Sequence, residues 1–266
     1  MRPEAELAAR RWRLVLPRLA LSGAQGDRRA RGVGSSVEFE THRGFAPGDD
    51  PRRVDWRVFA RTERLQVRLS RAEVAPAIDV VVDTSASMAI CARKATAVSD
   101  LVAALDVWGR GAGMRVRLLA ADGGPLDAER LVFEGAEREL LPRVPLRPRS
   151  VRVVVSDFLW PSDPAPRLVR VAADAAHLLV VQILDPDELE PARAGAVALV
   201  DCESGATLET ALDAARIATY RDRLERLCRS VDQAARRVGS RLNRVTVGAP
   251  AAMFEELGRQ GMVEPA

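Results

Sequence analysis

Three polar residues at fixed spacing follow an apolar run near the middle of the chain. The run IDVVVDTSASM, residues 78–88, carries Asp83, Ser85 and Ser87. If the backbone stays extended, side chains at positions i, i+2 and i+4 project to the same side, so one carboxylate and two hydroxyls converge. The spacing therefore predicts a site that offers only oxygen ligands.

A second apolar run supplies another carboxylate. VRVVVSD, residues 151–157, ends in Ser156 and Asp157. The carboxyl ends of parallel strands meet at one edge of the sheet, where ligands of open α/β sheets bind. Hard cations prefer oxygen ligands and need only one or two carboxylates. We therefore expect Mg²⁺ or Mn²⁺ to be held by Asp83, Ser85, Ser87 and Asp157.

Two other interpretations of the Asp83 segment remain open. An aspartate followed by threonine and serine after a strand is also typical of a helix N-cap, whose side chains satisfy free N–H groups. A strand that ends in Asp-Thr-Ser also resembles, weakly, the nucleophile loop of haloacid dehalogenase-type phosphatases. Those enzymes use a second aspartate where this chain has Ser85, so the acid for leaving-group protonation is missing. We predict a protein that is not an enzyme, with a metal-dependent phosphohydrolase as the outside alternative.

The elements that must position these residues are apolar runs separated by helical stretches. Continuous β-branched runs are typical of strands that are buried on both faces of a parallel sheet. The sequence predicts an α/β fold with a mostly parallel sheet flanked by helices. The expected strands cover residues 78–83, 114–120, 151–157, 177–184 and 241–248, with a hairpin near Ser204-Gly205, a long helix over about 211–238 and a last helix near 250–260.

The chain before this sheet has a different character. Residues 1 to about 20 have helical apolar spacing, residues 22–36 are rich in glycine and arginine, and residues 37–71 contain short alternating segments. We therefore divide the chain into an N-terminal extension, 1–75, and a main domain, 76–266.

The composition limits the function classes. The 266 residues include 40 basic and 37 acidic side chains, a net charge of +3 that does not call for a polyanionic partner. No apolar run approaches the roughly 20 residues of a membrane span, so we expect a cytoplasmic protein without a membrane span. We expect no nucleic-acid partner, because no basic-aromatic interleaving or known reader motif is present. Lys94 is the only lysine, which we interpret as codon bias.

The spacing of Asp83, Ser85 and Ser87 resembles the metal-ion-dependent adhesion site of von Willebrand factor A domains. In that family two further loops add a threonine and an aspartate, and the aspartate is similar to Asp157. No threonine lies between Thr96 and Thr207, so the expected middle loop, within 121–150, offers only groups such as Asp122 or Asp127. The resemblance therefore implies a metal site that is weakened, remodelled or vestigial.

The segment before the sheet narrows the resemblance. With DTSASM after it, the segment resembles a bacterial family of von Willebrand factor A-like proteins, domain of unknown function number fifty-eight, in its short soluble form. We expect its interleaved carboxylates and guanidinium groups to clamp one another, with Trp56 buried as an anchor. The matching residues are Glu38, Phe39, Arg43, Pro47, Gly48, Asp49, Asp50, Arg53, Asp55, Trp56, Arg57, Ala60, Arg61 and Leu65.

The resemblance implies a partner. Members of that family are often encoded beside MoxR-type AAA+ ATPases, so it implies an adaptor that works with such an ATPase. The expected mechanism is a metal ion that bridges this site to an acidic residue of a partner or client protein. A scaffold domain whose metal site is vestigial is the main alternative.

Overall fold

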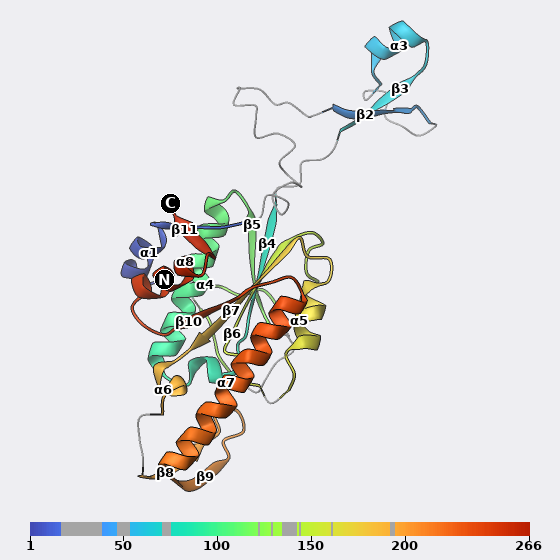
Figure 1. The fold of residues 1–266 in the computed structure, drawn as a ribbon. Helices are drawn as coiled ribbons and strands as arrows, with labels where there is room; N and C mark the ends of the chain where they lie inside the picture. The colour runs from blue at the N-terminus through green and yellow to red at the C-terminus, as the bar shows by residue number, and fades with distance from the viewer. Residues whose placement is uncertain are drawn as a thin grey trace. The chain divides into compact units, whose positions relative to one another are not determined.

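The computed structural model describes residues 1–16, 39–46, 54–70, 76–121, 123–128, 130–134, 143, 145–160, 162–191 and 195–266. Two compact units are present (Figure 1). The first, the sheet unit, combines Met1–Leu21 with Pro76–Ala266, and the second is Ser22–Ala75. The sheet unit carries every residue of the expected metal site.

A five-stranded parallel sheet forms the centre of the sheet unit (Figure 1). Its strand order is β10-β7-β6-β4-β5. The expected α/β fold of the von Willebrand factor A type, Rossmann-like, is confirmed, and β4 and β6 are apolar throughout most of their length because both of their faces are buried. The strands are β4 (Ala77–Val82), β5 (Arg115–Ala120), β6 (Val151–Ser156), β7 (His177–Leu184) and β10 (Leu242–Thr246).

The strand order creates a topological switch point. The chain passes from β4 to β5 on one side, whereas the next strand, β6, lies on the other side of β4. The two central strands pair in register, with Val82 opposite Val155. Ligands of open α/β sheets bind outside the carboxyl ends of the strands at such a point. The residues that directly follow β4 and β6 are therefore placed where a ligand is expected.

Helices cover both faces of the sheet (Figure 1). One hydrophobic core contains Leu101, Leu105 and Phe254, and the other contains Phe158 and Leu168. The first face carries α1 (Pro3–Ala9), α4 (Ala92–Gly111) and α8 (Pro250–Arg259), and the second carries α5 (Ala165–Ala172) and α7 (Ala214–Arg237). These helices bury apolar residues against the sheet, and α4 also buries the charged side chains of Lys94 and Asp100.

The two ends of the described chain pair with each other. β1 (Trp12–Leu14) is antiparallel to β11 (Val263–Pro265), and Trp108 Nε1 on α4 donates to the Ala9 carbonyl at 2.8 Å. Residues 1–21 therefore belong to the sheet unit and not to the N-terminal extension in which we placed them. The expected N-terminal helix is also shorter, because α1 ends at Ala9.

A separate two-stranded hairpin precedes α7, as expected. It consists of β8 (Gly195–Val200) and β9 (Thr207–Leu212). Gly205 has φ of +72° in the connecting turn, a conformation that side chains with a Cβ rarely adopt. Asp213 then caps α7 by accepting from Arg216 N at 2.8 Å.

Within its described residues, the second unit has a hairpin and one helix. The hairpin pairs β2 (Phe39–Gly44) with β3 (Gln66–Ser70), and the helix is α3 (Trp56–Thr62). Asp55 caps α3 by accepting from Arg57 N at 3.0 Å. Trp56 is 60% exposed, so the burial that we expected of it is not seen. In the parts of the chain described here, no helix is both long and apolar enough to cross a membrane.

Candidate functional site

Asp83 directly follows β4 and is fully buried. Its backbone N–H donates to the Val155 carbonyl at 2.8 Å, which continues the pairing of β4 with β6. Its carboxylate accepts from Ser85 N at 3.0 Å and from Ser156 Oγ at 2.7 Å. The side chain is therefore held at the switch point by neutral donors.

The charge on Asp83 is poorly compensated. Burial raises the pKa of Asp83, and the negative charge of Asp157 raises it further. The hydrogen bonds from Ser156 and Ser85 act in the opposite direction, but the pKa stays above its ordinary value. A cation beside Asp83 would stabilise its ionised form.

The two serines of the motif meet each other. The backbone does not stay extended as far as Ser87, because the short 3-10 helix η2 (Ala86–Ala89) begins directly after Ser85. The two hydroxyl oxygens are nevertheless 3.0 Å apart. Ser85 makes no side-chain hydrogen bond to the start of η2, so helix capping does not account for its hydroxyl.

Asp157 directly follows β6 and is also fully buried. Its Oδ1 accepts from Leu159 N at 3.1 Å, and its backbone carbonyl accepts from Gln182 Nε2 at 2.8 Å. Its Oδ2 accepts from Lys94 Nζ at 2.8 Å. Asp157 thus has a cationic partner inside the protein, whereas the contacts of Asp83 are neutral.

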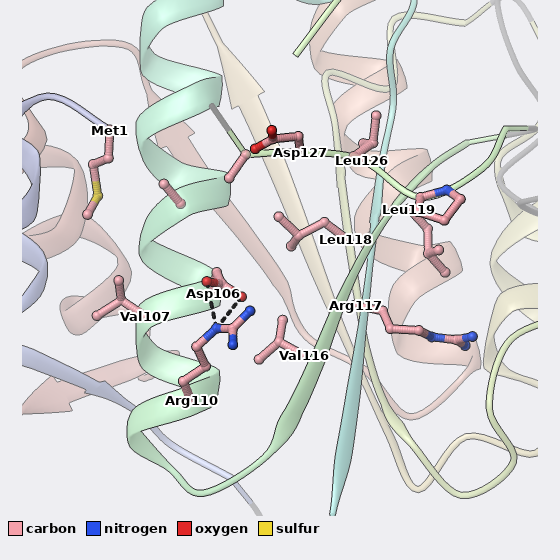
Figure 2. A pocket seen from close by; sticks show the side chains of 13 residues that line it. Met1, Asp106, Val107, Arg110, Val116, Arg117, Leu118, Leu119, Leu126 and Asp127 are labelled. Carbon is pink, nitrogen blue, oxygen red and sulfur yellow. Dashed lines mark hydrogen bonds and ion pairs between the residues drawn. The ribbon is translucent and has the colours of Figure 1, made fainter. Parts of the chain in front are cut away.

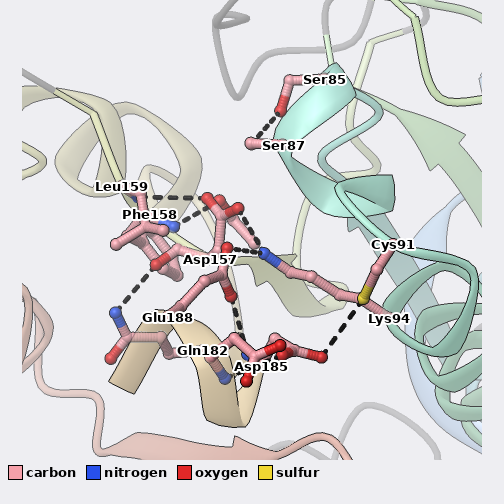
Figure 3. A network of polar contacts seen from close by, with 12 residues as sticks. Ser85, Ser87, Cys91, Lys94, Asp157, Phe158, Leu159, Gln182, Asp185 and Glu188 are labelled. Atoms are coloured by element: carbon pink, nitrogen blue, oxygen red, sulfur yellow. Dashed lines mark hydrogen bonds and ion pairs between the residues drawn. The ribbon is translucent and has the colours of Figure 1, made fainter. Parts of the chain in front are cut away.

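Lys94 is the residue that the sequence interpretation missed. Its side chain is fully buried in the first turn of α4, and Nζ also donates to Glu188 Oε1 at 2.7 Å (Figure 3). Burial lowers the pKa of Lys94, but the charges of Asp157 and Glu188 raise it more, so the amine stays protonated. Codon bias does not explain why a lysine is buried in this position. The feature of the sequence that could have drawn attention to Lys94 is that the chain has no other lysine.

Glu188 ties this network to the helix after β7. It lies in α6 (Pro186–Leu189), where its Oε2 accepts from the N-cap residue Asp185 N at 2.7 Å. Arg93 Nε donates to Asp185 Oδ2 at 2.7 Å, and this guanidinium holds the pKa of Asp185 at about 2. Tyr220 on α7 donates to the Glu188 carbonyl at 2.6 Å. The site is therefore connected to α4, α6 and α7.

The donor set suits a hard cation only in part. Among the described residues, no group of three or more His, Cys, Asp or Glu side chains is arranged to hold a metal ion. The arrangement at Asp83, Ser85 and Ser87 offers one carboxylate and two hydroxyls, which is the oxygen chemistry that Mg²⁺ or Mn²⁺ accepts together with water. Two buried carboxylates, Asp157 and Glu188, share the Lys94 ammonium ion, and the buried Asp83 carboxylate at the adjacent strand end accepts only from neutral donors, so the three carboxyl groups formally outnumber the one ammonium ion by two. The donors and the charge surplus fit one divalent cation.

The middle loop approaches the site through its backbone. Glu134 N donates to the Thr84 carbonyl at 2.9 Å, so this loop passes beside the Asp83 turn without a threonine hydroxyl. Asp127 lies instead in a pocket of about 700 Å³ between α4 and β5, beside the Asp106–Arg110 ion pair (Figure 2). Asp122 lies outside the described residues.

The family-signature residues belong to the second unit. Asp55, Trp56, Arg57 and Arg61 lie at or in α3, and the clamp between carboxylates and arginines stays a prediction. For Phe39 and Arg43 only the backbone, in β2, is described. The residues that lie outside the described part are Glu38, Pro47, Gly48, Asp49, Asp50 and Arg53.

Comparisons with known proteins find relatives of unassigned function. The family described as "Protein of unknown function DUF58" matches residues 41–129 and 134–234. Uncharacterised proteins of Mycobacterium bovis (Mb1516) and Mycobacterium tuberculosis (Rv1480) are each 30% identical over 241 residues, which cover 80% of this chain and 75% of the relative. Among solved structures, the conserved hypothetical protein BatB from Bacteroides thetaiotaomicron is 12% identical with a TM-score of 0.36, and the match covers 69% of this chain and 98% of that chain.

Proposed function

The chain belongs to the DUF58 family, and from this premise and the geometry of the switch point we propose that it is a non-catalytic protein-interaction domain that depends on a divalent cation. The proposal rests on the buried Asp83 carboxylate, which lies at the switch point of the sheet near the two motif hydroxyls and whose donors, Ser85 N and Ser156 Oγ, are neutral. The surplus of carboxylates around it supports the same assignment.

Mg²⁺ or Mn²⁺ is the proposed cofactor. Asp83, Ser85 and Ser87 would hold it, and Asp157 would add negative charge at the adjacent strand end. When bound, such an ion supplies a Lewis-acidic position that a carboxylate of another protein can occupy. This chain's residues orient that position and bury the charge that attracts the ion.

The proposed partner is a MoxR-type AAA+ ATPase, on the basis of the family resemblance, with an acidic residue of that partner or of a client protein as the contact. Because such ATPases need ATP, we place the encounter in the cytoplasm. The alternative is a scaffold domain with a vestigial metal site, and the observation that favours it is the ammonium ion of Lys94, which already neutralises part of the carboxylate charge.

Affinity capture from lysate of the source organism tests this function. Wild-type protein and Asp83→Asn serve as baits, each with Mg²⁺ and with EDTA, and Arg110→Gln serves as a surface control. We expect an AAA+ ATPase only with wild type and Arg110→Gln in Mg²⁺, and the purified ATPase should reproduce this pattern. Capture in all conditions would contradict the metal bridge and support the scaffold.

The enzymatic alternative has a separate test. Turnover of p-nitrophenyl phosphate by the purified protein with Mg²⁺, abolished in Asp83→Asn, would favour a phosphohydrolase. We expect no turnover, because position 85 carries serine where the general acid would be needed.

A further inference from the structure

Lys94 lies in the interior with no access to solvent. Its ammonium group donates to Asp157 at 2.8 Å and to Glu188 at 2.7 Å, and the side chains of Lys94 and Asp157 are both 0% exposed. Removing an ammonium ion from water is costly unless carboxylates and hydrogen bonds compensate it. The two carboxylates supply that compensation, so the position of the charge is fixed by the fold.

The two strand-end aspartates consequently differ in what they can offer. Both oxygens of Asp157 are engaged, one by the ammonium ion and one by Leu159 N. The oxygens of Asp83 accept from a backbone N–H and from a hydroxyl, which are neutral and leave its charge available. A cation at this end of the sheet is therefore attracted to Asp83 and repelled by Lys94.

We propose that the Lys94 ammonium ion occupies the position beside Asp157 in which a divalent cation would otherwise use Asp157 as a ligand. The protein therefore binds such a cation weakly, through Asp83, Ser85 and Ser87. This inference rests on the proposed cation site and names the residue that sets its affinity. Lys94 acts as a built-in monovalent cation, and its removal opens a site with two carboxylates.

The physical basis is charge and ligand number. A divalent ion near Asp157 would lie within a few ångströms of a buried like charge, where water screens the repulsion only weakly. The affinity of oxygen sites for divalent ions changes by orders of magnitude with the number of charged ligands. Replacing Lys94 by methionine keeps an unbranched apolar side chain as far as the ε position, removes the ammonium group and frees Asp157.

The first experiment is calorimetric titration of Mn²⁺ into wild type, Lys94→Met and Arg110→Gln, with circular dichroism to verify folding. We expect Lys94→Met to bind Mn²⁺ at least tenfold more tightly than wild type, with Arg110→Gln unchanged. Equal affinity of Lys94→Met and wild type would overturn this inference and leave the proposed site intact. No binding to either protein would overturn both.

A second measurement uses the wild-type protein alone, in case Lys94→Met does not fold. Because the chain contains a single lysine, selective ¹⁵N labelling of lysine gives one side-chain amine signal when the tag lacks lysine. We expect slow exchange of its protons with water. Mn²⁺ should broaden the signal, whereas EDTA-treated buffer without divalent ions should leave it sharp. Fast exchange typical of an exposed lysine, or a signal that saturating Mn²⁺ leaves sharp, would overturn the inference.

Discussion

Two ionic clusters lie at opposite ends of β4 and β6. They differ in the sign of their surplus charge. The amino-end cluster consists of Asp79, Arg117, Arg147 and Arg152. The carboxyl-end cluster consists of Asp83, Asp157, Glu188 and Lys94. The first has one carboxylate for three guanidinium groups, and the second has three carboxylates for one ammonium ion.

The carboxylate of the amino-end cluster has its full set of cationic partners. Asp79 accepts from Arg117 at 2.9 and 2.7 Å and from Arg147 N and Nε, both at 2.8 Å. Burial raises the pKa of Asp79, but the hydrogen bonds from Arg117 and Arg147 lower it more. Arg147 and Arg152 also donate to backbone carbonyls, including those of Ile78 and Val171.

The difference separates a structural cluster from a candidate binding site. In the amino-end cluster, the single carboxylate of Asp79 is fully paired and the guanidinium groups also donate to backbone carbonyls, although burial lowers the pKa of Arg152 and its Nε has no partner among the described residues. In the carboxyl-end cluster, Asp83 keeps a raised pKa after all its hydrogen bonds are counted. A cationic ligand could complete the charge compensation of Asp83, which lies at the switch point.

The largest expected effect is the loss of Asp79. Asp79→Asn would leave two guanidinium groups without their carboxylate, and breaking a buried pair in this way costs about 3–5 kcal/mol of the free energy of unfolding. Urea unfolding followed by circular dichroism measures it, and Mg²⁺ should not restore the loss. A loss below about 1 kcal/mol would show that the amino-end cluster is not the structural clamp described above.

Arg93→Gln is expected to have a smaller effect, with a defined pH dependence. A carboxyl whose pKa is lowered on folding adds stability above its ordinary pKa of 3.8, and this stability is lost as the pH falls toward about 2. Arg93→Gln should therefore lose less than half as much stability as Asp79→Asn at pH 7, and the difference from wild type should vanish near pH 2. Thermal unfolding between pH 7 and pH 2 tests this.

The matched control for Arg93 is Arg110→Gln. Its ion pair with Asp106 is a surface pair within one helix, and such pairs contribute little. We expect no measurable change at any pH. If both variants respond alike, the contact of Arg93 with the N-cap residue Asp185 has no special role.

Asp83→Asn is expected to change stability less than Asp79→Asn and Arg93→Gln do, either slightly or in the stabilising direction. A carboxyl whose pKa is raised on folding favours the folded protein below its ordinary pKa of 3.8 and loses that contribution as the pH rises. At pH 7 in EDTA, the free energy of unfolding of Asp83→Asn should lie within about 1 kcal/mol of the wild-type value or above it. Mn²⁺ should stabilise the wild type but not the variant. A large loss of stability of the variant in EDTA would contradict the difference between the two clusters.

The sheet could be predicted from the sequence because its strands are buried on both faces. Runs such as residues 78–83 and 151–157 are apolar enough to identify strands, and the polar residues after them identify the edge that carries the site. The pairing of β1 with β11 could not be predicted, because each strand has three residues and their partners lie about 250 positions apart.

The role of Lys94 was hidden for the same physical reason. Its two partners lie 63 and 94 residues away in the sequence, and only the fold brings them together. A lysine in the first turn of a helix is normally solvated, so its burial depends on how the fold brings the start of α4 to Asp157 after β6 and to Glu188 in α6. The sequence likewise identified Ser156 only as a residue of a strand and did not indicate that its hydroxyl contacts Asp83.

The closure of the sheet unit by β1 and β11 has a consequence for synthesis on the ribosome. α1 packs on α4 and α8, and β1 pairs with β11; α8 and β11 are made long after α1 and β1. At roughly 5–20 residues per second, the first segment waits tens of seconds before residues 263–265 emerge. Over that interval α4 is available to the buried faces of Ala5, Ala9 and Leu14 but α8 and β11 are not, so a nascent chain arrested before residue 250 should be recognised by chaperones that bind apolar segments.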